Sequence, residues 1–364
     1  MNKTKNIITI SLCCLLIFGF ALAGLLIPDG DVSRSERRKL QQKPELSVDA
    51  LLSGEYMEEL ETWQLDQFPL RDSLRSVDAW FKHYVLRQSD NNGVYLHEGG
   101  LYKAEYPLDE KQVLMAADKI ESITSQYLTG MDVYYSIIPD KNYFVYETSD
   151  RPAMDYGRLK ELMSENVTAE YIDIFDSLTI EDYYCTDAHW RQESIYPVAE
   201  TLAAAMGSEI AAYDSYEQNR IYPFYGVYMG QASLPAEPDT IVYLENEHTA
   251  AAVVTGAEFE GTKPMYEPEQ IQSLDGYNVY LSGPQAVLTM ECPTAESERE
   301  LIIFRDSFGS SIAPYFAGAY SKVTLIDLRY INSAMLDQFV TFNKNSDVLF
   351  LYCTSLINSG ALLK

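Results

Sequence analysis

Ser307 occupies a position in the sequence at which a serine could act as a nucleophile. It follows the apolar stretch "LIIFRD" and precedes a predicted helix. In an open parallel sheet, ligands bind beyond the carboxyl ends of the strands. A serine there can hold its hydroxyl forward while the free N–H groups of the next helix face a developing oxyanion. Such a serine could attack an acyl group. The same position is also that of an ordinary helix N-cap, so the nucleophile interpretation requires a base nearby.

The candidate base is His189, one of four histidines with His83, His97 and His248. His189 stands in "CTDAHW", two residues after Asp187. If this segment is extended, the two side chains project to the same side. The carboxylate can then hold the imidazole in one tautomer while the other ring nitrogen faces a serine. The alternative is an exposed loop histidine beside an acid. No two histidines are close in sequence and no Cys/His cluster appears, so a metal site is not expected. Acyl transfer by a serine and a histidine implies no organic cofactor.

Short apolar strands alternate with helices in two parts of the chain. Strands are expected at 132–138, 169–175, 301–304, 322–328 and 347–352, and helices around 110–127, 155–167, 193–206, 312–320 and 333–342. This pattern is typical of a parallel sheet covered by helices on both faces, so the predicted fold class is α/β. Residues 211–299 carry tyrosines, prolines and short alternating runs instead. They indicate a β-rich insertion between two parts of one sheet.

The first 28 residues differ from the rest of the chain. Lys3 and Lys5 precede an uncharged apolar run from Ile7 to Ile27, which is long enough to span a bilayer as a helix. Lysines before the span place the N-terminus in the cytoplasm and everything after Pro28 outside. The "ALAG" at 21–24 could be a signal-peptidase site, but the apolar run continues beyond it. We therefore favour an uncleaved transmembrane anchor.

Residues 29–90 are expected to connect this anchor to an α/β domain at 91–364. The stretch "SRSERRKLQQKPELS" is polar and basic, which suits a juxtamembrane connector. Residues 49–87 predict two helices that are broken at Pro69. The alternating stretch "NNGVYLHEGGLYK" indicates a β-hairpin around Gly99 and Gly100.

The charge and the cysteines exclude some classes of function. Lys and Arg number 27 against 54 Asp and Glu, which gives a net charge of −27 at pH 7. Such a chain lacks the electrostatic attraction on which nucleic-acid binding depends, so DNA and RNA are excluded as partners. Cys13 and Cys14 lie in the predicted span. Cys185, Cys292 and Cys353 are odd in number and lack metal-ligand spacing, so we expect core thiols and no disulfide framework.

Several stretches together resemble one protein family. "TDAHW" is similar to the D-H-H-W signature of the DHHW family of bacterial extracytoplasmic proteins, relatives of the alginate O-acetylation proteins AlgX and AlgJ with an SGNH-hydrolase-like fold. Further similar stretches lie in the family's order: "SRSERRKLQQKPELS", "LDQFPLRDSL", "GVYLHEGGLY", "IIPDKNYFVY", "RDSFGSSIAPYF" and "TLIDLRYIN". The resemblance covers most of residues 29–357.

The resemblance implies a Ser-His-Asp triad formed by Ser307, His189 and Asp187. Ala188 stands where the family signature has its first His. Because the middle residue of an extended segment points away from its neighbours, we expect the triad to survive this change. The serine block reads R-D-S, whereas the wider hydrolase group has G-D-S, and this leaves the oxyanion donors open.

Six other residues are weaker candidates for substrate binding or oxyanion stabilisation: Lys141, Tyr143, Trp190, Gly226, Arg305 and Arg329. Trp190 could instead pack the loop that carries the histidine, and Gly226 could be a turn glycine. Lys141 could be a solvated side chain, and Arg329 could pair with Asp306 or Asp327.

Three functions remain open at this point. The first is an extracytoplasmic O-acetyltransferase, in which Ser307 takes an acetyl group and passes it to a hydroxyl of a cell-surface or secreted polysaccharide. The resemblance implies this acceptor, and it implies a membrane-bound O-acyltransferase as the acetyl donor. The second is a carbohydrate acetylesterase with the same triad. The third is a non-catalytic polysaccharide-binding or scaffold subunit of an acetylation complex. We favour the first, because the D-x-H and D-S pairs are intact.

Overall fold

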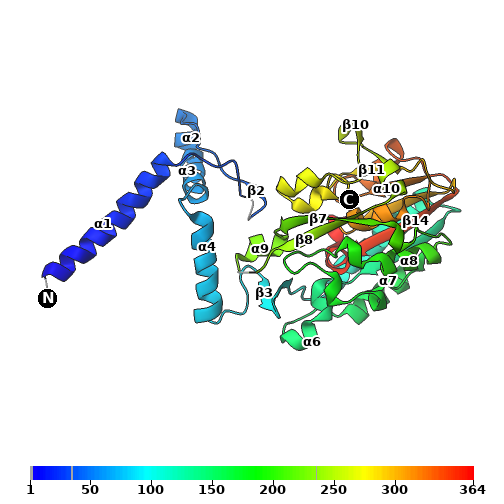
Figure 1. Ribbon diagram of the computed structural model, residues 1–364, viewed down its shortest axis with the longest axis horizontal. Helices are drawn as coiled ribbons and strands as arrows, with labels where there is room; N and C mark the ends of the chain where they lie inside the picture. Colours follow the sequence, from blue (N-terminus) through cyan, green and yellow to red (C-terminus); the bar gives the residue numbers. More distant parts are fainter. Residues whose placement is uncertain (1–2, 34–35, 235) are drawn as a thin grey trace. The chain divides into compact units, whose positions relative to one another are not determined.

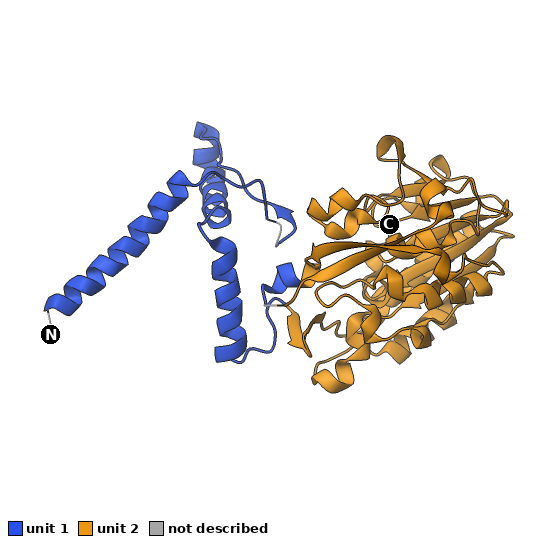
Figure 2. Cartoon of the chain, in the orientation of Figure 1, with its two compact units in different colours: residues 1–92, 229–235 blue, residues 93–228, 236–364 orange. Residues whose placement is uncertain are grey.

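The computed structural model describes residues 3–33, 36–234 and 236–364 (Figure 1). The chain forms two compact units (Figure 2). The first comprises Met1–Asn92 with Met229–Pro235, and the second comprises Gly93–Tyr228 with Ala236–Lys364. The first unit holds the N-terminal apolar helix and the helices that follow it, and the second holds the large sheet.

The first unit is mainly helical. Its elements are α1 Lys3–Leu26, β1 Val32–Ser33, β2 Arg38–Lys39, α2 Val48–Ser53, α3 Glu55–Asp66, α4 Arg71–Trp80 and the π-helix η1 Phe81–Val85. With a mean hydropathy of 2.5 over its most apolar part, α1 is long and apolar enough to cross a membrane. The predicted break at Pro69 is confirmed. A second break occurs at Gly54, whose φ of +88° ends α2, because glycine adopts this left-handed conformation without strain.

The second unit is built on one eight-stranded sheet in the order β10-β9-β11-β13-β12-β14-β5-β6. Its strands are β5 Asp132–Ile138, β6 Glu170–Tyr171, β9 Val253–Gly256, β10 Phe259–Lys263, β11 Val287–Glu291, β12 Glu300–Arg305, β13 Lys322–Ile326 and β14 Ser346–Cys353. The five strands β13, β12, β14, β5 and β6 are mutually parallel, so their carboxyl ends meet at one edge. The α/β fold class predicted from the sequence is confirmed.

Both faces of the sheet are buried, which explains the continuous apolar strands. Successive residues of β12 point to opposite faces, so that Leu301 and Ile303 join one apolar cluster while Ile302 and Phe304 join the other. The helices that cover the sheet are α5 Glu110–Tyr127, α7 Tyr156–Asn166 and α8 Tyr196–Ala205. The first two pack in the cluster of Ile302 and Phe304, and α8 packs in the other. This two-sided core fixes the strand ends that carry the polar residues described below.

The predicted insertion differs from expectation in its relation to the sheet. Among the described residues of this segment, β7 Glu217–Phe224 and β8 Asp239–Glu245 form a separate antiparallel pair. The strands β9, β10 and β11 continue the main sheet through antiparallel pairing of β11 with β13. The segment is therefore partly an extension of the sheet. Further elements are β3 Val94–His97, β4 Gly100–Lys103, η2 Lys141–Phe144, α6 Tyr146–Ser149, α9 Val227–Ala232, α10 Glu247–Ala251, η8 Gly276–Val279 and α12 Thr354–Ile357.

Two predicted helices are much shorter than expected. The one around 312–320 is a single turn, α11 Gly309–Ile312, followed by the 3-10 helix η9 Ala313–Phe316. Pro314 has no N–H and cannot continue an α-helical ladder, which explains the change. The one around 333–342 is the 3-10 helix η10 Ser333–Gln338. The predicted hairpin at Gly99 is confirmed, with Gly99 at φ +85° between β3 and β4.

Candidate active site

Ser307 lies two residues after the end of β12, in the turn that leads into α11. Asp306 holds this turn from its buried position: its Oδ1 accepts the Phe308 N–H at 3.0 Å, and its Oδ2 accepts the Cys353 N–H at 2.7 Å. Its carbonyl accepts the Gly309 N–H at 3.1 Å. The serine turn is thus tied to the end of the neighbouring strand β14. The N–H groups of Phe308 and Gly309 are already engaged, so they are not the free oxyanion donors that the sequence suggested.

Three side chains from distant parts of the chain meet at this edge of the sheet. Ser307 Oγ lies 2.7 Å from Nε2 of His189, and Nδ1 of His189 lies 2.6 Å from Oδ1 of Asp187. Asp187 is fully buried and His189 is 8% exposed. When Nδ1 donates its proton to the carboxylate, Nε2 is left to accept the serine proton. The structure therefore brings together the three residues that the sequence singled out.

The Asp187 and His189 side chains meet for a different reason than expected. Residues 185–189 form a bend between Tyr183 and Trp190, which pair across it as an antiparallel bridge. Oδ1 of Asp187 also accepts the backbone N–H of His189 at 3.1 Å. The prediction of an extended segment was wrong. The contact is made by an Asx turn, in which the Asp187 side chain accepts the N–H two residues further on. Ala188 is half-buried in this bend, and the Asp–His contact does not involve it.

The bend is held by residues from β8 and from the start of α9 with the glycine before it. Oδ2 of Asp187 accepts the N–H of Val227 at 2.7 Å, and Gly226 donates its N–H to Thr186 Oγ1 at 2.9 Å. From β8, Asp239 accepts the N–H groups of Cys185 and Thr186 at 2.8 and 2.7 Å. Both carboxylate oxygens of Asp187 thus have backbone donors, which keep the group fixed.

Aromatic rings fix the orientation of the imidazole. Tyr277, in η8, stacks on His189 with ring centroids 3.9 Å apart and an angle of 10° between the planes. Its hydroxyl donates to Ser311 Oγ at 2.7 Å. Trp190 donates its Nε1–H to the same oxygen at 2.9 Å and is fully buried, so it packs the site and offers no face to a sugar. Tyr277 could not be singled out from the sequence, where its one signal is the high tyrosine content of the insertion.

The sequence of the segment that carries these residues matches one known family. The profile of the DHHW protein family matches residues 141–326, just over half of the chain, and this range includes Asp187, His189 and Ser307. The chain belongs to the DHHW protein family. Comparison with curated proteins gives no match.

Solved structures share the fold of this DHHW family protein at low sequence identity. A DHHW family protein from Eubacterium siraeum has a TM-score of 0.61 at 19% identity, over 75% of this chain and 94% of that one. Bacillus cereus PatB1 has a TM-score of 0.61 at 16% identity, over 74% of this chain and 98% of that one. The O-acetyltransferase domain of Pseudomonas putida AlgJ has a TM-score of 0.43 at 11% identity, over 73% of this chain and 92% of that one. The first two share the α/β fold of the second unit.

Lys141 in this DHHW family protein is buried and has no access to a substrate. Its ammonium group donates to the carbonyls of Leu101, Tyr184 and Cys185 at 2.6, 2.7 and 3.1 Å. These bonds use all three of its N–H donors. Burial lowers the pKa of Lys141 to about 8. Lys141 is therefore neither placed to contact a substrate nor solvated, the two roles considered from the sequence. It links β4 to the bend before His189 instead.

The two candidate arginines also support the site from within the protein. Arg305 is fully buried, donates from Nη1 to the Asp306 carbonyl at 3.2 Å and lies 3.9 Å from Oδ2 of Asp327. Burial lowers the pKa of Arg305 below its usual value. Arg329 makes two hydrogen bonds to the Asp327 carboxylate, at 2.9 and 2.6 Å, which is one of the two pairings anticipated from the sequence. Both side chains brace strand ends beside the serine turn.

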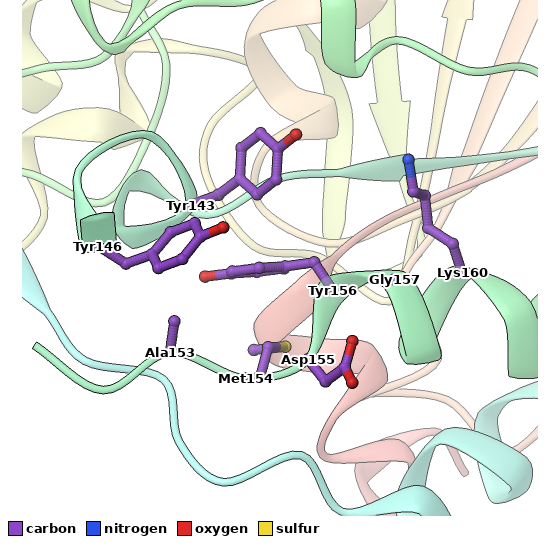
Figure 3. A pocket seen from close by; sticks show the side chains of 8 residues that line it. All are labelled: Tyr143, Tyr146, Ala153, Met154, Asp155, Tyr156, Gly157 and Lys160. Carbon is purple, nitrogen blue, oxygen red and sulfur yellow. The ribbon is translucent and has the colours of Figure 1, made fainter.

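Tyr143 lines a pocket that does not include the triad residues. The pocket has a volume of about 450 Å³. Figure 3 shows the rings of Tyr143, Tyr146 and Tyr156 around it, with Lys160 on α7. Tyr143 packs edge to face against Phe144, Tyr156 and Phe175.

The cysteines were expected to be core thiols. Cys292 is buried, as expected, whereas Cys185 is exposed.

Gly226 is required for a close approach of two backbone segments. A Cβ at this position would lie 2.2 Å from the carbonyl atoms of Thr186 and 2.4 Å from the nitrogen of Asp187. Backbone atoms can move aside only by displacing Asp187. We therefore expect Gly226→Ala to destabilise the protein by roughly 2 kcal/mol or more and to lower the reaction rate.

Calorimetric melting and an ester-cleavage assay measure both effects. The matched control is Gly157→Ala on α7, where the added Cβ meets only a carboxylate oxygen of Asp155 at 3.4 Å. This control should keep its melting temperature and activity. A Gly226→Ala protein that melts and reacts like the parent would show that the bend can shift without affecting the site.

Proposed function

We propose that the chain is an extracytoplasmic serine O-acetyltransferase that acts on cell-surface or secreted polysaccharide. The observation that carries this proposal is the chain of hydrogen bonds from Ser307 Oγ through the His189 ring to Asp187, at 2.7 and 2.6 Å. An unassisted serine hydroxyl is a weak nucleophile, and an oriented imidazole is the group that activates it. The sequence resemblance to the alginate O-acetylation proteins supports the acetyl group and the polysaccharide as reactants.

In the first half-reaction, Ser307 Oγ attacks the carbonyl carbon of an acetyl donor while Nε2 of His189 takes its proton. The imidazolium that forms is stabilised by the buried carboxylate of Asp187. Collapse of the tetrahedral intermediate breaks the bond to the leaving group, which takes the proton from His189. The product is an acetyl ester on Ser307. General-base assistance contributes roughly 10²- to 10⁴-fold to the rate of such a step.

In the second half-reaction, a sugar hydroxyl attacks the acetyl-serine. Nε2 of His189 takes the hydroxyl proton and then returns a proton to Ser307 Oγ, so the enzyme is regenerated and the sugar carries the ester. Attack by water in place of the sugar would make the same triad an acetylesterase. The chemistry of the triad is common to both reactions, and acceptor binding with exclusion of water distinguishes them.

The proposed location is the outer face of the cell membrane. The apolar helix α1 follows two lysines and is long enough to span the bilayer as an anchor. A membrane-bound O-acyltransferase that presents acetyl groups at this surface is the proposed donor partner. The acceptor is then a polysaccharide outside the cell, since a chain with a net charge of −27 is unsuited to nucleic acid.

A transfer assay with the full chain in detergent tests this proposal. The protein is incubated with an activated acetyl ester and mixed oligosaccharides, and acetylated sugars are followed by mass spectrometry. A sulfonyl fluoride serves as the probe of the nucleophile, because Bacillus cereus PatB1 has been solved with a sulfonyl adduct. We expect acetylated sugar, and a sulfonyl mass increase on the peptide that contains Ser307.

The possible outcomes separate the three functions. Ester cleavage without acetylated sugar, for any acceptor offered, favours the acetylesterase. A protein that neither cleaves the ester nor reacts with the sulfonyl fluoride has no activated serine, and this would leave the non-catalytic binding subunit.

A further inference from the structure

α4 and η1 form one helix whose apolar side is exposed and whose polar side is the more buried one. A helix on a globular protein normally packs its apolar stripe inward. Here Ala79 is fully buried, and on the same side Arg71 and Arg75 lie 2.7 and 3.4 Å from the carboxylate of Glu36. The side opposite Ala79 carries an apolar stripe with side chains 44% to 62% exposed: Leu74, Val77, Phe81, Tyr84 and Val85. We call this stripe, with Trp80 at its border, the outer stripe of α4.

The exposure of this stripe is unusual for its size and its composition. Its members recur at the three- and four-residue spacing of one helix face, so they form a continuous surface rather than scattered apolar residues. The helix of 15 residues is about 22 Å long. Trp80 and Tyr84 contact one another with ring centroids 5.7 Å apart. Aromatic rings with a polar atom are the side chains that favour the boundary between lipid and water.

A direct contact joins the start of α4 to the apolar helix α1. The rings of Phe20 and Phe68 stack with centroids 5.2 Å apart. A Cβ built on Gly24 would lie 3.8 Å from the Pro69 ring, so the two segments pass close to each other. Phe20 lies six residues before the end of α1, or about 9 Å along its axis. If α1 spans the bilayer with its lysines inside, Phe20 and Gly24 lie in the outer leaflet, and α4 begins at that level.

The charge of this segment also suits a membrane surface. Residues 68–88 hold four basic and two acidic side chains, a net charge of +2 in a chain whose net charge is −27. A helix with basic residues on its polar side and Trp, Phe and Leu on the other is typical of helices that lie in the plane of the interface. We propose that the outer stripe of α4 lies on the outer leaflet of the lipid bilayer that α1 crosses. This inference rests on the membrane location proposed above, and it is independent of catalysis.

Tryptophan quenching by brominated lipid tests the contact directly. The full chain is reconstituted in vesicles of phosphatidylcholine, brominated on its acyl chains, with phosphatidylglycerol. The sequence contains three tryptophans, Trp63, Trp80 and Trp190, and none lies in α1. We expect bromine near the glycerol end of the chains to quench the emission, and Trp80→Phe to reduce this quenching by about threefold or more. Trp63→Phe is the matched control and should leave the quenching in place.

A pair of substitutions on one helix separates lipid contact from a general effect of charge. Val77→Glu places a carboxylate in the outer stripe and should abolish the quenching. Ser76→Glu adds the same charge on a neighbouring position outside the stripe and should retain it. Circular dichroism of both variants checks that the helices persist. Ser307→Ala should be quenched like the parent, so a failure of the catalytic proposal does not affect this result.

Three results would overturn the inference. If the protein floats with the vesicles in a density gradient but Trp80→Phe leaves the quenching unchanged, α1 is inserted and α4 does not touch lipid. If Trp80 is shielded and the chain cross-links to itself through Val77→Cys, a second copy covers the stripe. If the protein does not float with the vesicles, the membrane location fails and the lipid contact fails with it, whatever the outcome of the acetyl-transfer assay.

Discussion

Ser307→Ala should lower the rate of acetyl transfer by about 10⁴- to 10⁶-fold, the range found when the nucleophile of a serine triad is removed. The reason is that the acetyl-serine ester cannot form without Oγ, while His189 and Asp187 remain in place. The hydrogen bond that Oγ makes to Nε2 of His189 at 2.7 Å contributes modestly to stability, so the melting temperature should change little. Steady-state kinetics with an activated acetyl ester, beside calorimetry, measure both quantities.

The matched control for this change is Ser310→Ala. Ser310 is buried in α11, three residues after Ser307, and its N–H donates to the Ser307 carbonyl. It should keep transfer activity within about tenfold of the parent, since a serine that takes no part in the reaction affects the rate only through packing. If Ser307→Ala were as active as Ser310→Ala, while His189→Ala lost activity, the nucleophile would be another group activated by the same imidazole.

The residues of the site could be found in the sequence because each has a local signal. Ser307 follows a buried strand, and the carboxyl ends of parallel strands are where ligand sites of α/β proteins lie. Asp187 and His189 are two residues apart, so any turn or strand keeps them close. The pairing of His189 with Ser307, 118 residues further along the chain, has no local signal. The family resemblance supplied that pairing, and the structure confirms that the atoms are in contact.

The surroundings of the triad could not be predicted in the same way. Tyr277 stacks on His189 from a 3-10 helix of the insertion, and nothing in its own neighbourhood marks it among 28 tyrosines. Lys141 lies in η2, shortly after the carboxyl end of β5. Its burial under the backbone of the hairpin and of the Cys185 bend depends on how three distant segments pack. A sequence pattern reports periodicity along one element and carries no information about such packing.

The fold shows the same division between local and distant information. The parallel strands β5, β12, β13 and β14 were visible as apolar runs, because both of their faces are buried. The strands β9, β10 and β11 are short and mix apolar with polar residues, so the sequence does not tell which sheet they join. The antiparallel pairing of β11 with β13, which attaches all three to the main sheet, is decided by tertiary contacts.

Asp187→Asn is the second change for which we expect a large effect. Oδ1 of Asp187 accepts two N–H groups, from the ring and the backbone of His189, and Oδ2 accepts the N–H of Val227. An asparagine amide has one oxygen and one NH₂ group, so either orientation sets a donor against a donor. With NH₂ toward the ring, the imidazole takes the tautomer with its proton on Nε2, and it can no longer accept the proton of Ser307.

We expect the turnover of Asp187→Asn to fall by about 10³- to 10⁴-fold, as is found when the carboxylate of a serine triad is made an amide. The buried donor left without an acceptor should also destabilise the protein by roughly 1 to 3 kcal/mol. Asp239→Asn is the comparator, because Asp239 holds the same bend through the N–H groups of Cys185 and Thr186 but does not touch the imidazole. It should lower the melting temperature by a similar amount while the turnover and the sulfonyl labelling of Ser307 persist. Equal losses of turnover in the two variants would mean that Asp187 only holds the bend, and that the base works without an oriented tautomer.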